Sequence, residues 1–141
     1  MEPITRITCR YRFAAAHVLR RRDLTEEENR ALFGPCSRPH GHNYELWVTV
    51  EGPVDPLSGM VVNFTMVDGI VADEVLEPCD HHDLDGDVPF LEGVLTTAEN
   101  LVRVFAARLA PRIAAAAPGA RLAHLRLHET HDTWVDLEMV G

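Results

Sequence analysis

The sequence HGHNYELWVTV, residues 40–50, alternates apolar and polar side chains and so predicts a β-strand with one buried face. The apolar positions from Tyr44 to Val50 share that face. His40 and His42 have the same parity, so this strand would carry two imidazoles side by side at one end of its buried face. A turn with exposed or merely hydrogen-bonded histidines is the alternative for H-G-H.

A second strand is predicted over residues 4–17, where apolar side chains at odd positions alternate with arginine and threonine. His17 has the apolar parity of this strand. If the two strands pair, His17 lies beside His40 and His42. Three imidazole ligands with a fourth position left open are typical of catalytic zinc. The sequence therefore predicts a zinc site at the paired ends of these strands.

Two helices are predicted in the middle of the chain. Residues 63–76 carry apolar side chains at helical spacing, and Pro78 is expected to end this helix. The second helix begins near Thr96 or Thr97, with Thr96 as the first residue of a capping box. Pro111 is expected to interrupt or end it.

The rest of the chain is predicted to form a connection and a closing hairpin. Residues 18–39 are polar and contain a short helix that starts with Thr25 and Glu28 as a capping box. Residues 121–129 and 133–140 alternate as two further strands. The order ββααββ predicts a two-layer α+β fold.

The amino-acid composition disfavours or excludes several classes of function. The 141 residues predict one domain, residues 1–141. A formal net charge of −9 disfavours a nucleic-acid or anionic-membrane partner. All 13 basic residues are arginine, which excludes chemistry that needs a lysine. Three cysteines without a C-x-x-C pair indicate the reducing cytoplasm, and no stretch approaches the ~18 apolar residues of a membrane span.

Other side chains are candidates for catalytic or binding roles, and each also has a simpler structural explanation. Three residues separate Cys36 from His40, so its thiol is a candidate base, a fourth zinc ligand or an inert group. Asp80 and His81 form either a proton-transfer pair or part of a solvated loop. Glu129 has core-facing parity in the hairpin, where it could accept two N–H donors of a pterin or guanine edge or make a structural hydrogen bond.

Two further groups are candidates for substrate contacts. Thr97 and Glu99 stand at the start of the second predicted helix, where capping is the plainer role. Arg38 and the run Arg20–Arg22 are candidates for holding an anionic group. A solvated basic turn also explains the run.

Six motifs in this order carry a family resemblance: F-A-A-A-H (13–17), C-S-R-P-H-G-H-N-Y (36–44), G-M-V-V-N-F (59–64), D-H-H-D-L-D (80–85), T-A-E-N-L (97–101) and H-E-T (128–130). Over nearly its whole length the chain resembles the 6-pyruvoyltetrahydropterin synthase and 6-carboxytetrahydropterin synthase family. The resemblance implies the tunnelling fold, with four antiparallel strands and two helices on one face in each subunit. Three such subunits close a barrel, and two trimers usually stack into a hexamer.

The resemblance also implies a small-molecule substrate, 7,8-dihydroneopterin triphosphate, from which triphosphate is eliminated. The three histidines would hold zinc. The implied catalytic residues are Cys36 as the base and Asp80 with His81 as a proton relay that reaches in from a neighbouring subunit. The implied substrate-binding residues are Glu129 as the pterin anchor, Thr97, Glu99 and Arg38.

Two product branches exist in this family. The spacing of Cys36 and His40 resembles the carboxy branch, which feeds queuosine-type deazapurine synthesis. The segment 24–34, the M-V-V-N-F motif and Thr96-Thr97 resemble the pyruvoyl branch of the tetrahydrobiopterin type. Because that spacing sets where the thiolate points beside the metal, we expect 6-carboxytetrahydropterin synthase, with 6-pyruvoyltetrahydropterin synthase as the alternative. A non-catalytic, zinc-stabilised pterin- or purine-binding protein is the alternative from another class.

Overall fold

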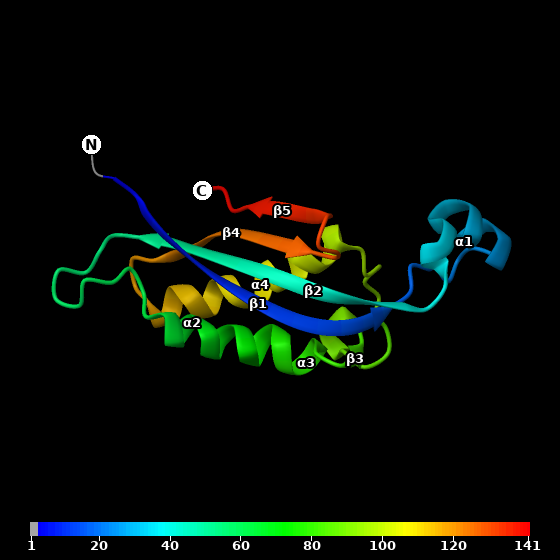
Figure 1. The fold of residues 1–141 in the computed structure, drawn as a ribbon, viewed down its shortest axis with the longest axis horizontal. Helices are drawn as coiled ribbons and strands as arrows, with labels where there is room; N and C mark the ends of the chain where they lie inside the picture. Colours follow the sequence, from blue (N-terminus) through cyan, green and yellow to red (C-terminus); the bar gives the residue numbers. More distant parts are fainter. Residues whose placement is uncertain (1–2) are drawn as a thin grey trace.

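The computed structural model describes residues 3–141. Its strands are β1 (Thr5–His17), β2 (His40–Gly52), β3 (His82–Asp83), β4 (Arg121–His128) and β5 (Trp134–Glu138). Its helices are α1 (Glu26–Phe33), α2 (Phe64–Val71), α3 (Glu77–Cys79) and α4 (Ala98–Ala116), with 3-10 turns at Gly34–Ser37 and Pro89–Leu91. The strands form one sheet in the order β3-β1-β2-β4-β5, and α2, α3 and α4 cover one of its faces (Figure 1).

The predicted α+β fold with helices on one face is confirmed, but the sheet has five strands and not four. The additional strand, β3, pairs parallel with β1, with His82 opposite Ala15 and Asp83 opposite Ala16. Two residues are too few to show the alternation from which a strand is predicted. The segment 77–94, expected to be a loop, therefore places one short edge strand beside β1.

The two long strands pair over their whole length and hold the core. His17 lies opposite His40, and Phe13 lies opposite Tyr44. The apolar face predicted for β2 is the buried one. Its four apolar side chains are fully buried under the helices: Tyr44, Leu46, Val48 and Val50. Burial of each such side chain stabilises the fold by about 1.5–3 kcal/mol, which holds the register that brings the histidines together.

Pro78 and Pro111, each expected to end or interrupt a helix, both lie inside helical segments. The chain stays helical from α2 through a π-helical turn, Ala72–Leu76, into α3. Pro78 stands in the first turn of α3, where its missing N–H is not needed. Pro111 lies within α4, which continues to Ala116 because the buried side chains of Leu109 and Ile113 on either side pack against the sheet and offset the lost hydrogen bond.

The cap of α4 is Thr97, and the expectation of a capping box at Thr96 was wrong. The Thr97 hydroxyl accepts a hydrogen bond from the backbone N–H of Asn100 at 3.2 Å. Thr96 is fully buried and points toward β1 instead. Sequence spacing alone could not separate two adjacent threonines.

The connection between β1 and β2 is ordered by local hydrogen bonds. The predicted capping box is present, because Thr25 Oγ1 accepts from the Glu28 N–H and Glu28 Oε1 accepts from the Thr25 N–H. The buried Asn29 side chain accepts from the Arg21 N–H and donates to three backbone carbonyls. These bonds fix the arginine run relative to α1, which stands out from the body of the molecule (Figure 1).

Across residues 3–141, the helices are all too short or too polar to span a lipid bilayer.

Candidate metal centre and active site

Three histidines meet where β1 ends and β2 begins. The ring nitrogens of His17, His40 and His42 that could bind a metal lie within 4.8 Å of one another, and the ring centroids are 4.5–5.1 Å apart. Among the described residues, this is the group of histidine, cysteine and acidic side chains that can hold a metal ion, and Cys36 is not part of it. The structure therefore brings together the predicted ligands and favours a centre of three histidines over a closed site with a thiolate.

Backbone carbonyls orient two of the rings. His17 Nδ1 lies 2.9 Å from the carbonyl oxygen of Thr96, and His40 Nδ1 lies 2.7 Å from that of Arg38. A carbonyl only accepts, so each Nδ1 carries the proton and donates it, and the lone pair is left on Nε2. Such bonds are the usual outer contacts of metal-binding histidines.

The donor set fits a metal ion. His17 is 2% exposed, and its Nε2 and that of His42 are buried without a hydrogen-bond partner. A buried polar atom without a partner is costly, so its retention points to a ligand that supplies the missing contact. Burial also lowers the pKa of both histidines, which keeps the imidazoles neutral, the form that binds metals.

A polar network behind His17 was not found from the sequence. The Thr96 hydroxyl lies 3.3 Å from His17 Nδ1 and donates to Asp85 Oδ1 at 3.0 Å. Asp85 Oδ2 accepts from the backbone N–H of Val18 at 2.8 Å. In the sequence, Asp85 stands out only as the last residue of D-H-H-D-L-D, and Thr96 is expected to cap a helix. Their spatial neighbour, His17, is remote in the chain and gives no local signal.

Glu129 lies next to the histidines, as a substrate anchor beside the metal would require. It follows β4, and its Oε1 lies 3.6 Å from His42 Nε2. Tyr44, expected from the sequence only as a core residue, packs against the rings of His17 and His42. Its ring stacks on Phe13 at 4.9 Å and meets the His42 ring edge-on at 5.5 Å, and its buried hydroxyl has no hydrogen-bond partner.

Asp80 and His81 form the predicted pair, with Asp80 Oδ1 3.0 Å from His81 Nδ1. Asp80 Oδ1 also accepts from the backbone N–H of Ala14, and this hydrogen bond holds the pKa of Asp80 below its ordinary value. His81 has a φ of 61°, a left-handed conformation that costs a non-glycine residue energy and often occurs at functional sites.

The pair shares a cleft with one of the three histidines. Asp80 and His81 line a cleft of about 920 Å³ together with His42 and Glu129. Within residues 3–141, neither Asp80 nor His81 makes a hydrogen bond or ion pair with the three histidines. His81 is also largely exposed.

The remaining predicted site residues are not gathered at the metal centre by direct contacts. Cys36 lies in the 3-10 turn after α1 with a half-buried thiol, and its carbonyl accepts from the Leu19 N–H at 2.8 Å. Thr97 caps α4, and Glu99 in its first turn is exposed. Arg38 is exposed and contacts His40 through its carbonyl oxygen, not its guanidinium.

The family model described as 6-pyruvoyl tetrahydropterin synthase matches residues 6–139. The chain belongs to this family. A 6-pyruvoyl tetrahydrobiopterin synthase of Poecilia reticulata is 40% identical over 131 residues, which cover 92% of this chain and 86% of that protein. The human 6-pyruvoyl tetrahydrobiopterin synthase is 42% identical over 97 residues, 67% of each chain.

Solved structures of the family share this fold. The Caenorhabditis elegans 6-pyruvoyl tetrahydropterin synthase superposes with a TM-score of 0.86 at 30% identity, over 98% of this chain and 97% of that one. The Plasmodium falciparum enzyme, at 14% identity, shows the same fold with a TM-score of 0.66, over 99% of this chain and 100% of that one. The resemblance seen in the six motifs and the expectation of an enzyme of this family are confirmed. The names of these relatives match the pyruvoyl alternative and not the carboxy branch that the Cys36–His40 spacing favoured.

Proposed function

We propose that this protein is a zinc-dependent lyase that converts 7,8-dihydroneopterin triphosphate to 6-pyruvoyltetrahydropterin with loss of triphosphate. The observation that carries the proposal is the three-histidine centre, with its unpartnered Nε2 atoms, in a member of the 6-pyruvoyl tetrahydropterin synthase family. The names of the curated relatives support the pyruvoyl product. The reaction is an internal redox rearrangement of the substrate, so it needs no external oxidant or reductant.

His17, His40 and His42 would hold the metal through their neutral imidazoles, and a set of three protein ligands is the pattern of catalytic zinc. When bound, zinc supplies Lewis acidity toward the hydroxyl groups of the substrate's side chain. The bonds from His17 to Thr96 and from His40 to Arg38 keep the rings in place for this role.

Glu129 is proposed to orient the pterin. As a carboxylate it accepts two parallel N–H bonds from the amino-pyrimidinone edge. Its position 3.6 Å from His42 would place the side chain attached to the pterin ring over the histidines. Thr97 and Glu99 are proposed to assist at the start of α4, although Thr97 is already engaged as its cap. Arg38 is proposed to face the phosphates from the turn beside His40.

Cys36 is proposed to move a proton on the substrate's side chain. The hydrogen bond from Leu19 to its carbonyl ties its turn to the end of β1, two residues from His17. Asp80 and His81 would serve as the second proton-transfer group. Because, within residues 3–141, this pair makes no hydrogen bond or ion pair with the three histidines, we infer that it acts in the site of a neighbouring subunit within a trimer or a hexamer of two trimers.

The carboxy reaction, which also releases acetaldehyde, is the second candidate. The spacing of three residues between Cys36 and His40 favours it. A non-catalytic pterin-binding protein would need neither the ordered turn at Cys36 nor the Asp80–His81 bond.

Product analysis by mass spectrometry tests these candidates directly. The zinc-loaded protein is incubated with 7,8-dihydroneopterin triphosphate, and pterins, triphosphate and acetaldehyde are measured. We expect 6-pyruvoyltetrahydropterin and triphosphate without acetaldehyde. Acetaldehyde with 6-carboxytetrahydropterin would move the protein to the carboxy branch, and unchanged substrate would favour the binding protein.

A further inference from the structure

An arginine on α4 contacts both flanks of the loop of residues 80–88, which carries the proposed proton-transfer pair. In the π-helical turn that precedes this loop, Arg108 Nε donates to the Glu74 carbonyl oxygen at 3.0 Å, and Arg108 Nη2 lies 2.7 Å from Glu74 Oε2. The central carbon of the guanidinium lies 3.7 Å from the ring centroid of Phe90, in the 3-10 turn that follows the loop. One side chain therefore holds the segments on either side of the loop.

The contact with the Glu74 carbonyl replaces a hydrogen bond that the helix cannot make. In a helix this carbonyl would accept from the N–H of residue 78, four residues further on, but Pro78 has no N–H. Arg108 Nε supplies a donor in its place. The helix can therefore continue past the proline, and the Asp80 N–H makes the helical bond to the Leu76 carbonyl at 2.8 Å.

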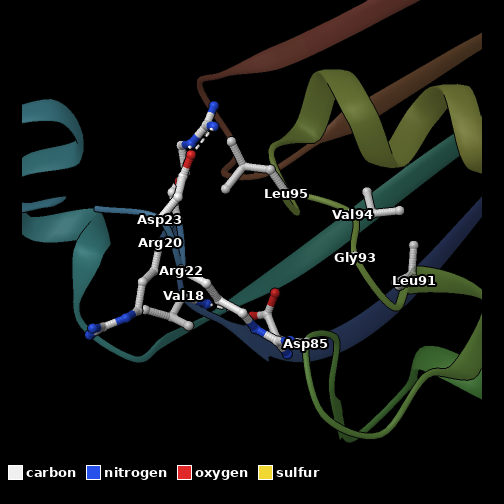
Figure 2. A pocket seen from close by; sticks show the side chains of 10 residues that line it. Val18, Arg20, Arg22, Asp23, Asp85, Leu91, Gly93, Val94 and Leu95 are labelled. Atoms are coloured by element: carbon white, nitrogen blue, oxygen red, sulfur yellow. Dashed lines mark hydrogen bonds and ion pairs between the residues drawn. The ribbon is translucent and has the colours of Figure 1, made fainter. Parts of the chain in front are cut away.

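The middle of the loop is bound to the end of β1. The His81 N–H donates to the Ala14 carbonyl oxygen at 2.6 Å. Asp85 accepts from the Val18 N–H at 2.8 Å, and Figure 2 shows its side chain beside Val18. The strand β3 in this loop has two residues, and so short a strand contributes little to the position of the loop.

His81 needs support from its surroundings because its backbone is strained. Its φ of 61° is a left-handed conformation, which a residue with a side chain keeps where the surrounding structure fixes it. The bonds to β1 act on the middle of the loop, whereas Arg108 acts on both flanks. Because the Arg108 side chain is partly buried, its contacts with Glu74 and with the Phe90 ring are stronger than they would be in water.

We propose that Arg108 is a positioning residue for the Asp80–His81 pair: it fixes the flanks of the loop and thereby holds the pair in the geometry that proton transfer requires. The proposal rests on the proposed function, because the proton transfer by this pair is part of that function. Within residues 3–141, Arg108 makes no hydrogen bond or ion pair with Asp80 or His81. It therefore acts through the loop and not as a catalytic group.

Steady-state kinetics of the zinc-loaded protein with 7,8-dihydroneopterin triphosphate test the proposal. Arg108→Met keeps an unbranched apolar side chain and removes the charge and the N–H donors. We expect kcat to fall about tenfold while KM changes by less than about twofold, because the pair is displaced and the proposed pterin anchor, Glu129, is untouched. Arg108→Lys restores a cation near Glu74 and Phe90 and should recover part of kcat.

Arg112→Met is the matched control. Arg112 lies one turn further along α4, and its hydrogen bonds go to the carboxylates of Asp73 and Glu74. The variant removes the same charge from the same helix and leaves both contacts of Arg108 in place, so its kcat should equal that of wild type. Equal kcat values for Arg108→Met and Arg112→Met would overturn the proposal, as would a rise in KM as the sole effect of Arg108→Met.

A double mutant separates positioning of the pair from a general effect on the enzyme. In the Asp80→Asn protein the pair is already disabled, so the addition of Arg108→Met should lower kcat by less than about twofold. Losses of kcat that multiply would place the effect of Arg108 outside the pair and contradict the proposal.

Amide hydrogen exchange gives a measurement that needs no turnover. We expect the His81 and Leu84 amides, which donate to β1 carbonyls, to exchange about tenfold faster in Arg108→Met, with the Leu125 and Leu127 amides of β4 unchanged. Faster exchange of the loop in a protein without any turnover would keep the positioning of the loop by Arg108 and refute the lyase. Turnover with unaltered exchange and kcat in Arg108→Met would refute the positioning role and leave the lyase standing.

Discussion

The Nδ1 atom of His17 and the carbonyl oxygen of Thr96, 79 residues apart in the chain, are joined by a hydrogen bond of 2.9 Å. This bond fixes the tautomer of the imidazole and points its Nε2 toward the other two histidines. The Thr96 hydroxyl continues the network to Asp85, whose second oxygen holds the backbone just after His17. The direction of the His17 ring, a candidate metal ligand, thus depends on two distant segments.

Asp85→Asn is expected to weaken metal binding about tenfold, because an amide cannot accept from both Thr96 and Val18 and the imidazole loses part of its support. The measurement is a competition titration of zinc against a chromophoric chelator. Asp132→Asn, in the exposed β4–β5 turn, is the matched control and should match wild type. Equal zinc affinities of both variants would show that the network does not position His17.

Cys36→Ala is expected to retain the metal but to lose turnover by at least a hundredfold, because a group that transfers protons on the substrate is removed. Metal content by mass spectrometry and initial rates are measured on the same sample. His42→Ala, in contrast, should lose the bound metal. Cys9→Ala, on β1, controls for loss of a thiol elsewhere. Full turnover of Cys36→Ala would exclude the thiol from catalysis.

Glu129→Ala is expected to weaken binding of 7,8-dihydroneopterin about tenfold or more while zinc affinity changes by less than about threefold. The carboxylate offers two charge-assisted hydrogen bonds to the pterin, whereas its contact with His42 is long at 3.6 Å. Calorimetry supplies both affinities. Glu92→Ala, in an exposed loop, is the control. A variant that loses zinc and keeps the pterin would assign Glu129 to the metal instead.

Tyr44→Phe is expected not to lower the free energy of unfolding of the metal-free protein. The Tyr44 hydroxyl is buried without a partner, so its removal takes away a desolvation cost and leaves the stacking on Phe13 intact. Tyr44→Ala, which removes the ring, should cost about 3–5 kcal/mol. Urea denaturation of the three proteins gives the comparison, and a marked loss of stability in Tyr44→Phe would reveal a partner for the hydroxyl.

In the Asp80→Asn protein, the free energy of unfolding is expected to fall less steeply as the pH is lowered. The pKa of Asp80 is lower in the folded protein than its ordinary value of 3.8, chiefly because the Ala14 N–H binds the carboxylate. Its stabilising contribution is therefore present above pH 3.8 and is lost as the pH falls through the lowered pKa. Urea midpoints between pH 2.5 and 6 should fall less steeply for the variant than for Asp132→Asn. Parallel curves would mean that the carboxylate is not bound in the native state.

Much of the site could be predicted from the sequence because the signals are local. The alternation in β1 and β2 places His17, His40 and His42 on one face, since side chains alternate with a period of two. The capping box of Thr25 and Glu28 lies within four residues and was equally visible. Six short motifs in this order were enough to recognise the family, because each is readable within a few residues.

Other features depend on segments that are remote in the chain. The sequence could not tell which of Thr96 and Thr97 caps α4, because only the packing of Thr96 against His17 decides it. The strand β3 exists only because β1 offers an unpaired edge beside it. Pro111 is tolerated because Leu109 and Ile113, two residues away on either side, are buried.

By itself, the sequence determined the two-layer α+β fold, the three histidines on one face and the family. These follow from side-chain periodicity and local motifs, which are set within a few residues. The tertiary structure alone decided which ring nitrogen of His17 is free and that Glu129 stands beside His42. Each of these is a contact between distant segments, and it forms only when burial of the core brings the ends of β1, β2 and β4 together.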